Sequence, residues 1–122
     1  MAKATGVGGV FLRAKDPAAL VKWYTDVLGL ENYAGGYTVF RSSGGETLTW
    51  AVFPANTDYF GSREQAVMVN YRVDDLNGML DRLREAGATV DDRLEEHEYG
   101  RFGWAFDPEG NRIELWQPPP GQ

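Results

Sequence analysis

The sequence predicts an α+β fold built from two β-α-β-β-β modules in one chain. A strand-forming stretch that leads into a capped helix occurs twice, at an offset of 59 residues. A strand, glycine turn and strand segment also occurs twice, at an offset of 66 residues. Two recurrences in the same order at similar spacing indicate a duplicated unit. A chain of 122 residues supplies one compact domain.

The first unit begins with residues 7–15 (VGGVFLRAK), which are rich in strand formers. Asp16 and Pro17 follow as a helix N-cap and a proline at the first helical position. Gly29 stands where a left-handed C-terminal cap is expected. The apolar residues between these caps recur at helical spacing and predict one buried stripe. They are Leu20, Tyr24, Val27 and Leu28, with Trp23 beside them.

The second unit repeats this order, with a predicted strand at 67–73 and the cap pair Asp74-Asp75. Its helical stripe is formed by Leu76, Met79, Leu80 and Leu83, and Gly87 ends it.

The segments that end the two halves are residues 39–50 (VFRSSGGETLTW) and 105–116 (AFDPEGNRIELW). Superposing them places Leu48 on Glu114 and Trp50 on Trp116. Residues 107–110 (DPEG) favour a type I turn before the last strand. We expect module 1 at about 6–54, a connector at about 55–65, module 2 at about 66–118 and a short tail at 119–122.

Composition excludes several classes of function. The formal charge is −6 and no Lys/Arg cluster is present, which argues against nucleic acid or an anionic membrane as partner. The absence of cysteine excludes disulfides, thiolate metal sites and cysteine nucleophiles. No apolar run is long enough to span a membrane and no signal peptide is evident, so we expect a soluble, cytoplasmic protein.

The chain resembles a known family at residues 15–31 (KDPAALVKWYTDVLGLE) and 106–118 (FDPEGNRIELWQP). Both segments are similar to the vicinal oxygen chelate superfamily of glyoxalases, bleomycin-resistance proteins and extradiol dioxygenases. The resemblance implies that paired β-α-β-β-β modules form a half-open cup, and that the protein is a homodimer. It leaves open whether one chain or two build each cup.

The resemblance also implies four metal-ligand positions, on the first and last strands of each module. They fall on Gly9, Leu48, Met68 and Glu114, and only Glu114 carries a ligand for a hard divalent ion. We therefore expect no metal and no other cofactor, with a divalent ion on Glu114 as the alternative. His97 lies outside the pattern and is expected on the surface.

Strand alternation predicts which side chains line the cup. Gly9 shares a face with Phe11 and Arg13, and Met68 shares a face with Asn70 and Arg72. By the same rule Glu46, Leu48 and Trp50 face the cup in module 1, as do Arg112, Glu114 and Trp116 in module 2. Tyr99, Arg101 and Trp104 are expected at the cup or its rim. The candidate ligand-binding residues are Phe11, Arg13, Leu48, Trp50, Met68, Asn70, Arg72, Tyr99, Trp104 and Trp116.

Each candidate also has a structural interpretation. Trp50 and Trp116 could be core or dimer-interface residues, and Asn70 could bridge strands. Arg13 and Arg72 could pair with Glu114 or Glu46, which we favour over ligand capture because a buried arginine needs a partner. Tyr59 and Phe60, expected to be exposed, could form a lid or pack against a partner subunit.

For function, the sequence favours a protein that binds a small aromatic or anionic organic molecule in its cup without the metal. The rival hypothesis is an enzyme. One form is a metal-dependent lyase, isomerase or dioxygenase with Glu114 as ligand. Another is metal-free proton transfer with Glu114 as base and Arg13 or Arg72 stabilising an enolate. For Glu114 itself, pairing with an arginine ranks first and catalysis second.

Overall fold

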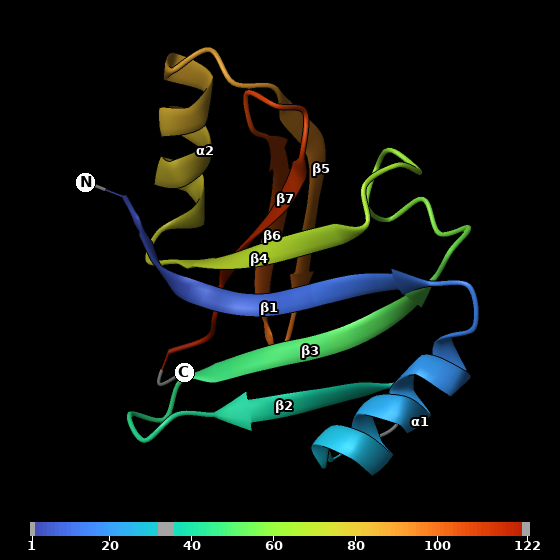
Figure 1. The fold of residues 1–122 in the computed structure, drawn as a ribbon. Coiled ribbons are helices and arrows are strands. Elements are labelled where there is room, and N and C mark those ends of the chain that lie inside the picture. Colours follow the sequence, from blue (N-terminus) through green and yellow to red (C-terminus); the bar gives the residue numbers. More distant parts are fainter. Residues whose placement is uncertain (1, 32–35, 121–122) are drawn as a thin grey trace.

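The computed structural model describes residues 2–31 and 36–120. They form two helices and seven strands, and each half begins with a strand followed by a helix, as the duplication predicts (Figure 1). The first half contains β1 (Ala4–Ala14), α1 (Pro17–Leu28), β2 (Tyr37–Arg41) and β3 (Thr47–Pro54). The second contains β4 (Val67–Val73), α2 (Leu76–Glu85), β5 (Val90–His97), β6 (Gly100–Phe106) and β7 (Arg112–Gln117).

All seven strands join one sheet in the order β2-β3-β1-β4-β7-β6-β5. The two halves meet where β1 pairs with β4 antiparallel. Within each half the first strand pairs in parallel with the last, β1 with β3 and β4 with β7. The described part of the first half has two strands after its helix where we expected three. Residues 32–35, between α1 and β2, lie outside the described residues.

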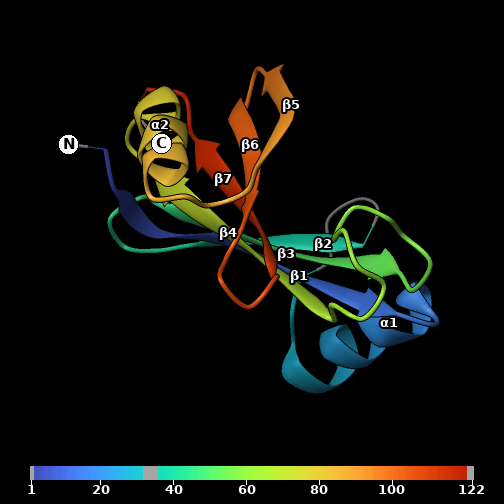
Figure 2. The ribbon, with the colours of Figure 1, turned by 90° about the horizontal axis from the view of Figure 1, so that it is seen from above.

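The sheet is bent into a half-open cup. In Figure 2, strands β5 to β7 rise steeply from the half that contains β1 to β3. The predicted α+β architecture is therefore confirmed, and both walls of this cup come from one chain.

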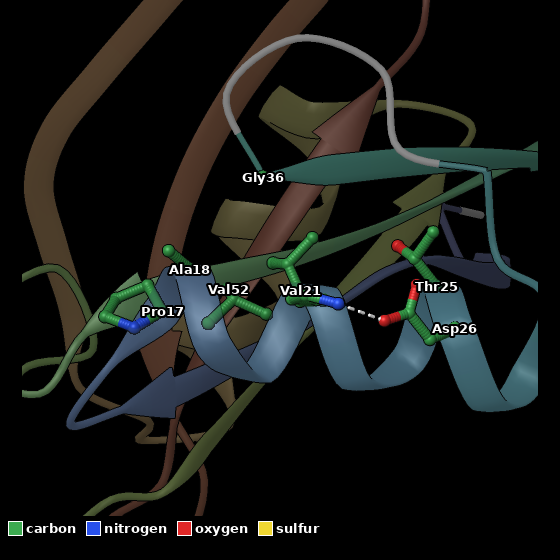
Figure 3. Close-up of a pocket in the computed structure, with 8 residues that line it drawn as sticks. Pro17, Ala18, Val21, Thr25, Asp26, Gly36 and Val52 are labelled. Carbon is green, nitrogen blue, oxygen red and sulfur yellow. Dashed lines mark hydrogen bonds and ion pairs between the residues drawn. The ribbon is translucent and has the colours of Figure 1, made fainter.

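Helix α1 begins and ends as predicted but buries less than expected. The Asp16 side chain accepts a hydrogen bond from the Ala19 N–H at 3.1 Å, and Gly29 has φ 74°. Val21 is buried, whereas Trp23, Val27 and Leu28 are more than half exposed. The predicted stripe is therefore wrong at Val27 and Leu28, whereas Leu20 and Tyr24 are half-buried, because α1 turns Val21 toward the sheet. A groove of about 540 Å³ stays open beside it, lined by Val21, Gly36 and Val52 (Figure 3).

Helix α2 forms the larger core with the sheet face that lies outside the cup. Asp75 caps it by accepting from the Gly78 N–H at 3.1 Å. The apolar residues of β4 and β7 lie under this helix, as strand alternation predicts for the sheet face opposite the cup. The buried core residues are Val73, Leu76, Met79, Leu80, Ala105 and Leu115.

A second, smaller hydrophobic core lies at the base of the cup. It contains Phe11, Phe60, Met68 and Trp104, three of which have no measurable exposure. The base of the cup is thus densely packed, which fixes the side chains that project from it. Neither helix of the described residues has the length and apolar character that crossing a bilayer requires.

Candidate functional site

The concave face of the sheet encloses a cavity of about 880 Å³. Strands from both halves and the connector between them contribute to its wall. Among the described residues, seven aromatic rings line it: Phe11, Tyr37, Phe53, Tyr59, Tyr99, Phe102 and Trp116. Its ionisable side chains, besides the tyrosines, are Arg41, Glu95, His97 and Glu114. Aromatic walls with a few convergent polar groups are typical of small-ligand sites.

Glu114 lies in the wall of this cavity and is only 1% exposed. Strand β7 presents it there because Glu114 pairs with Asn70 on one side and Trp104 on the other. The Asn70 amide donates to Oε1 at 2.6 Å, and the Trp104 indole donates to Oε2 at 3.0 Å. The Tyr59 hydroxyl also donates to Oε2. Three neutral donors therefore hold the carboxylate in one orientation.

The pKa of Glu114 is raised above its ordinary value, because burial penalises the charged form. The donors Tyr59, Asn70 and Trp104 lower the pKa without cancelling the effect of burial. Burial and the neighbouring Glu114 charge also raise the pKa of Tyr59, so its hydroxyl keeps its proton. Glu114 can therefore exchange a proton or accept a hydrogen bond from a ligand.

Tyr59 reaches Glu114 from the connector, and Arg13 holds that connector in place. The Arg13 guanidinium donates to the carbonyls of Ala55, Thr57, Ser62 and Gln65 at 2.7–3.1 Å. It also lies 4.9 Å over the ring of Phe60. The Tyr59 ring stacks on Phe53 at 5.3 Å. Sequence reasoning missed this arrangement, because the connector has no periodicity that assigns its residues to a face.

Asn70 and Gly8 form the cup wall beside Glu114. Asn70 is 3% exposed, and its Oδ1 has no hydrogen-bond partner among the described residues. A Cβ on Gly8 would lie 2.5 Å from that Oδ1 and 2.7 Å from the Trp116 ring. Glycine is thus required for β1 to pass this close to Asn70 and Trp116.

On β3 the structure turns the opposite face to the cup from the one we predicted. Thr47, Thr49, Ala51 and Phe53 line the cavity, and Trp50 instead contacts Tyr24 of α1 at 4.7 Å. Leu48 shares the face of Trp50 and so also points away from the cup. The physical reason is the parallel register, in which Phe11 pairs with Ala51 as Asn70 pairs with Glu114. Ala51, and not Leu48, is therefore the counterpart of Glu114.

On the other strands most of the predicted residues lie on the cup side of the sheet. Phe11, Asn70 and Trp116 line the cavity, as does Tyr99 at the rim. Met68 and Trp104 point the same way but lie in the packed base, with no measurable exposure. Phe102 shares the cup face with Trp104 and was missed. Arg101 lies on the other face, where it contacts Asn77 of α2 and Glu96.

Among the described residues, no arginine pairs with Glu114, contrary to the expectation that ranked first. Arg13 binds connector carbonyls, as above. Arg72 pairs with Glu46 at 3.3 Å, one of the predicted partners, and lies 4.8 Å over the Trp116 ring. Arg112 pairs with Asp91 at 2.8 Å. A buried carboxylate without an adjacent cation is the unexpected feature of this site.

Two residues with no expected contact to the cup take part in its structure. His97 is exposed, as expected, but it also lines the cavity and stacks on Tyr99 at 4.8 Å. Its Nε2 lies 2.9 Å from Glu95, whose pKa is lowered by that contact and by Arg93. Phe60, expected to be exposed, is fully buried beneath Arg13.

The residues around Glu114 do not fit the divalent metal that the resemblance implies. No group of three or more His, Asp or Glu side chains converges anywhere within residues 2–31 and 36–120. Of the four implied positions, Gly9 has no side chain, Leu48 and Met68 have apolar side chains, and only Glu114 supplies a carboxylate. A Cβ on Gly9 would already lie 3.0 Å from the Thr49 carbonyl oxygen. The Glu114 oxygens face an amide, an indole and a phenol.

Known structures share this fold at low sequence identity. Methylmalonyl-CoA epimerase from Mycobacterium tuberculosis aligns with TM-score 0.65 and 20% identity, over 96% of this chain and 90% of that one. A Streptomyces coelicolor methylmalonyl-CoA epimerase complex aligns with TM-score 0.68 and 17% identity, over 95% of this chain and 99% of that one. The Mn(II)-bound glyoxalase from Novosphingobium aromaticivorans aligns with TM-score 0.65 and 17% identity, over 96% of this chain and 40% of that one. These likenesses concern the fold alone.

The sequence itself matches a family model over most of its length. A comparison with curated protein sequences found no match. The family model described as the Glyoxalase/Bleomycin resistance protein/Dioxygenase superfamily covers residues 6–115. The chain therefore belongs to the Glyoxalase/Bleomycin resistance protein/Dioxygenase superfamily.

Proposed function

We propose that the protein binds a small aromatic organic molecule in its cup, without a metal ion. The observation that carries the proposal is a cavity of about 880 Å³ with seven aromatic rings in its wall and one buried carboxylate. Planar rings such as Phe102 and Trp116 offer stacking surfaces to a planar ligand. A metal ion at Glu114 would find no second protein ligand, because the neighbours of this carboxylate are a phenol, an amide and an indole. Binding of an organic molecule is therefore the better supported role.

The anionic ligands that we first considered are less well supported. Arg13 and Arg72, the two arginines expected to clamp an anion, are already bonded to connector carbonyls and to Glu46. Arg41 remains at the cavity, where its Nη1 donates to the Gly45 carbonyl at 3.1 Å. An anion entering the cup would meet Glu114 without a neighbouring cation.

A thermal-shift screen with small aromatic compounds tests the proposal, because a ligand that binds the folded state raises its apparent stability. Ala51→Trp fills the cavity from β3 and should abolish the shift caused by any compound that binds there. Trp50→Phe is the matched control, since Trp50 contacts α1 and lies outside the cup. A shift that survives Ala51→Trp but is lost in Trp50→Phe would place the ligand outside the cup.

Metal-free proton transfer is the second candidate function. The raised pKa of Glu114 favours it, because a carboxylate that binds its proton more tightly is a stronger base. Glu114 would take a proton from a carbon next to a carbonyl and return it to that carbon. Arg13 already donates to connector carbonyls and Arg72 already pairs with Glu46, so fewer of their N–H groups are left for an enolate oxygen than we expected. This weakens the enzyme hypothesis relative to binding.

Solvent exchange distinguishes the two candidates. Methylmalonyl-CoA, which is bound in a methylmalonyl-CoA epimerase structure with the same fold, is a suitable carbon acid to incubate with the protein in D₂O. Deuterium incorporation that depends on Glu114 and is lost in Glu114→Gln would establish proton transfer. Exchange at the uncatalysed rate in both proteins would leave binding as the function.

We further propose a homodimer. The exposed apolar side chains Trp23, Val27 and Leu28 on α1 are a surface that a second copy could cover. Light scattering after size exclusion should give twice the 13.6 kDa chain mass. A monomer at micromolar concentration would contradict this.

A further inference from the structure

Glu114 is a buried carboxylate whose charge no protein cation neutralises. It is 1% exposed and accepts hydrogen bonds from three neutral groups. None of the ion pairs among the described residues includes it. Arg112, a cation that lowers the pKa of Glu114 electrostatically, lies over the Trp104 ring at 5.2 Å and pairs with Asp91. Burying a carboxylate is costly unless a cation or a proton compensates it.

The hydrogen-bond arrangement leaves room for one more donor. An ionised carboxylate offers about four acceptor positions. Oε2 accepts from Tyr59 and Trp104, whereas Oε1 accepts from Asn70 alone. Beside it, Asn70 Oδ1 has no hydrogen-bond partner among the described residues, but it is buried against Gly8 of β1. The open acceptor position on Glu114 Oε1 therefore favours a ligand that carries an N–H group.

The rings around Glu114 are suited to a cation. A positive group over an aromatic face is attracted by the negative potential of the ring. The protein already uses one wall of the cup in this way, because the Arg72 guanidinium lies 4.8 Å over Trp116. Phe11, Phe53, Tyr59 and Phe102 line the remaining cavity. A net charge of −6 also favours the approach of a cation.

We propose that the cup selects an organic cation that combines an aromatic ring with N–H donors, such as an aryl amidinium or an aryl ammonium, and places its N–H on Glu114 Oε1. This inference rests on the proposed binding of an aromatic molecule in the same cup. It adds the charge and the donor group of the ligand. The protein's three neutral donors orient the carboxylate, and the ligand supplies the missing positive charge.

Three probes of similar size and different charge test the proposal by isothermal titration calorimetry. Benzamidine is the cation with two N–H donor groups, benzyl alcohol is neutral, and benzoate is the anion. We expect benzamidine to bind at least about 10-fold more tightly than benzyl alcohol, as a charge-assisted hydrogen bond predicts. Benzoate should bind more weakly than either. This comparison uses the unmodified protein and needs no variant.

The variant Glu114→Gln then assigns the effect to its residue. Its affinity for benzamidine should fall about 10-fold or more, while its affinity for benzyl alcohol should change less than about 3-fold. Glu109→Gln makes the same chemical change in an exposed turn and should leave both affinities unchanged. Ammonium chloride at the same concentration should not compete with benzamidine, because it lacks the ring.

The outcomes separate the two proposals. Benzyl alcohol that binds in the cup at least as tightly as benzamidine overturns the inference and leaves the aromatic site intact. Tightest binding of benzoate, or equal competition by ammonium, also overturns it. If none of the three probes binds, the proposed function and the inference fail together.

Discussion

Replacing Tyr59 with phenylalanine tests how the connector controls Glu114. The Tyr59 hydroxyl donates to Glu114 Oε2, and its ring stacks on Phe53 and meets Trp104 edge-on at 6.1 Å. Phenylalanine retains both ring contacts and removes only the hydroxyl. Trp104 remains as the second donor to Oε2. The substitution therefore removes one donor of three from a carboxylate that is 1% exposed.

The expected cost follows from the charge on the acceptor. A hydrogen bond to a charged group contributes about 1.5–3 kcal/mol to stability, and a bond between neutral groups contributes about 1 kcal/mol. With Glu114 ionised, Tyr59→Phe should lower the free energy of unfolding by about 2 kcal/mol. With Glu114 protonated, the loss should shrink to about 1 kcal/mol or less.

The pH dependence has a definite sign. Glu114 has a raised pKa in the folded protein, so its stabilising contribution is complete below the pKa of the unfolded chain, about 4.3. That contribution is lost as the pH rises through the folded pKa. Removing Tyr59's hydroxyl raises the folded pKa further, because that bond favours the ionised form. As the pH rises above the folded pKa of Glu114, the variant should therefore lose more stability than the parent.

Urea unfolding at about pH 4 and about pH 8 measures the difference between variant and parent. Tyr71→Phe is the control, since Tyr71 packs against the α2 core on the other sheet face. A Tyr59→Phe cost that is equal at both pH values would refute the proposed bond to an ionisable Glu114. So would a cost no larger than that of Tyr71→Phe near pH 8.

Three further substitutions probe the scaffold. Gly8→Ala should cost about 1–3 kcal/mol in urea unfolding because its Cβ would lie 2.5 Å from Asn70 Oδ1, while Gly6→Ala, with no atom within 4 Å, should cost less than half as much. Arg13→Lys cannot reach four carbonyls with one ammonium, so hydrogen exchange of connector amides should quicken while amides of α2 stay protected; unchanged connector exchange would contradict the anchoring role. Asp16→Ala should lower the free energy of unfolding by about 1 kcal/mol, and Asp16→Asn by much less, because asparagine still accepts from Ala19 N–H; equal losses would exclude capping.

The fold could be predicted because its signals are local and repeated. Asp16, Pro17 and Gly29 delimit α1 by capping chemistry, and the same chemistry recurs at Asp75. The burial of α1 could not be predicted in this way. Helical spacing marks an apolar stripe, but it does not say how closely the helix lies on its sheet. Val27 and Leu28 are consequently exposed although they belong to the stripe.

The site was predictable on β1, β4 and β7, where alternation places Phe11, Asn70 and Glu114 on one face. The prediction failed on β3, because we set its register by superposing residues 39–50 on residues 105–116. The structure sets that register through the pairing of β3 with β1. A slip of one residue reverses every side chain of a strand. Arg13 holds the connector, and Tyr59 reaches Glu114 from it, through tertiary contacts that no sequence period encodes.

Glu114 faces the cup as a carboxylate held by three neutral donors, and we propose that it does not ligate a metal. Metal analysis of protein purified without chelators, combined with thermal-shift titrations of nickel, zinc, iron and manganese, tests it most directly. We predict no stoichiometric metal and no saturable stabilisation by any of these ions. Stoichiometric metal that is lost in Glu114→Ala, together with stabilisation that depends on Glu114, would contradict the account.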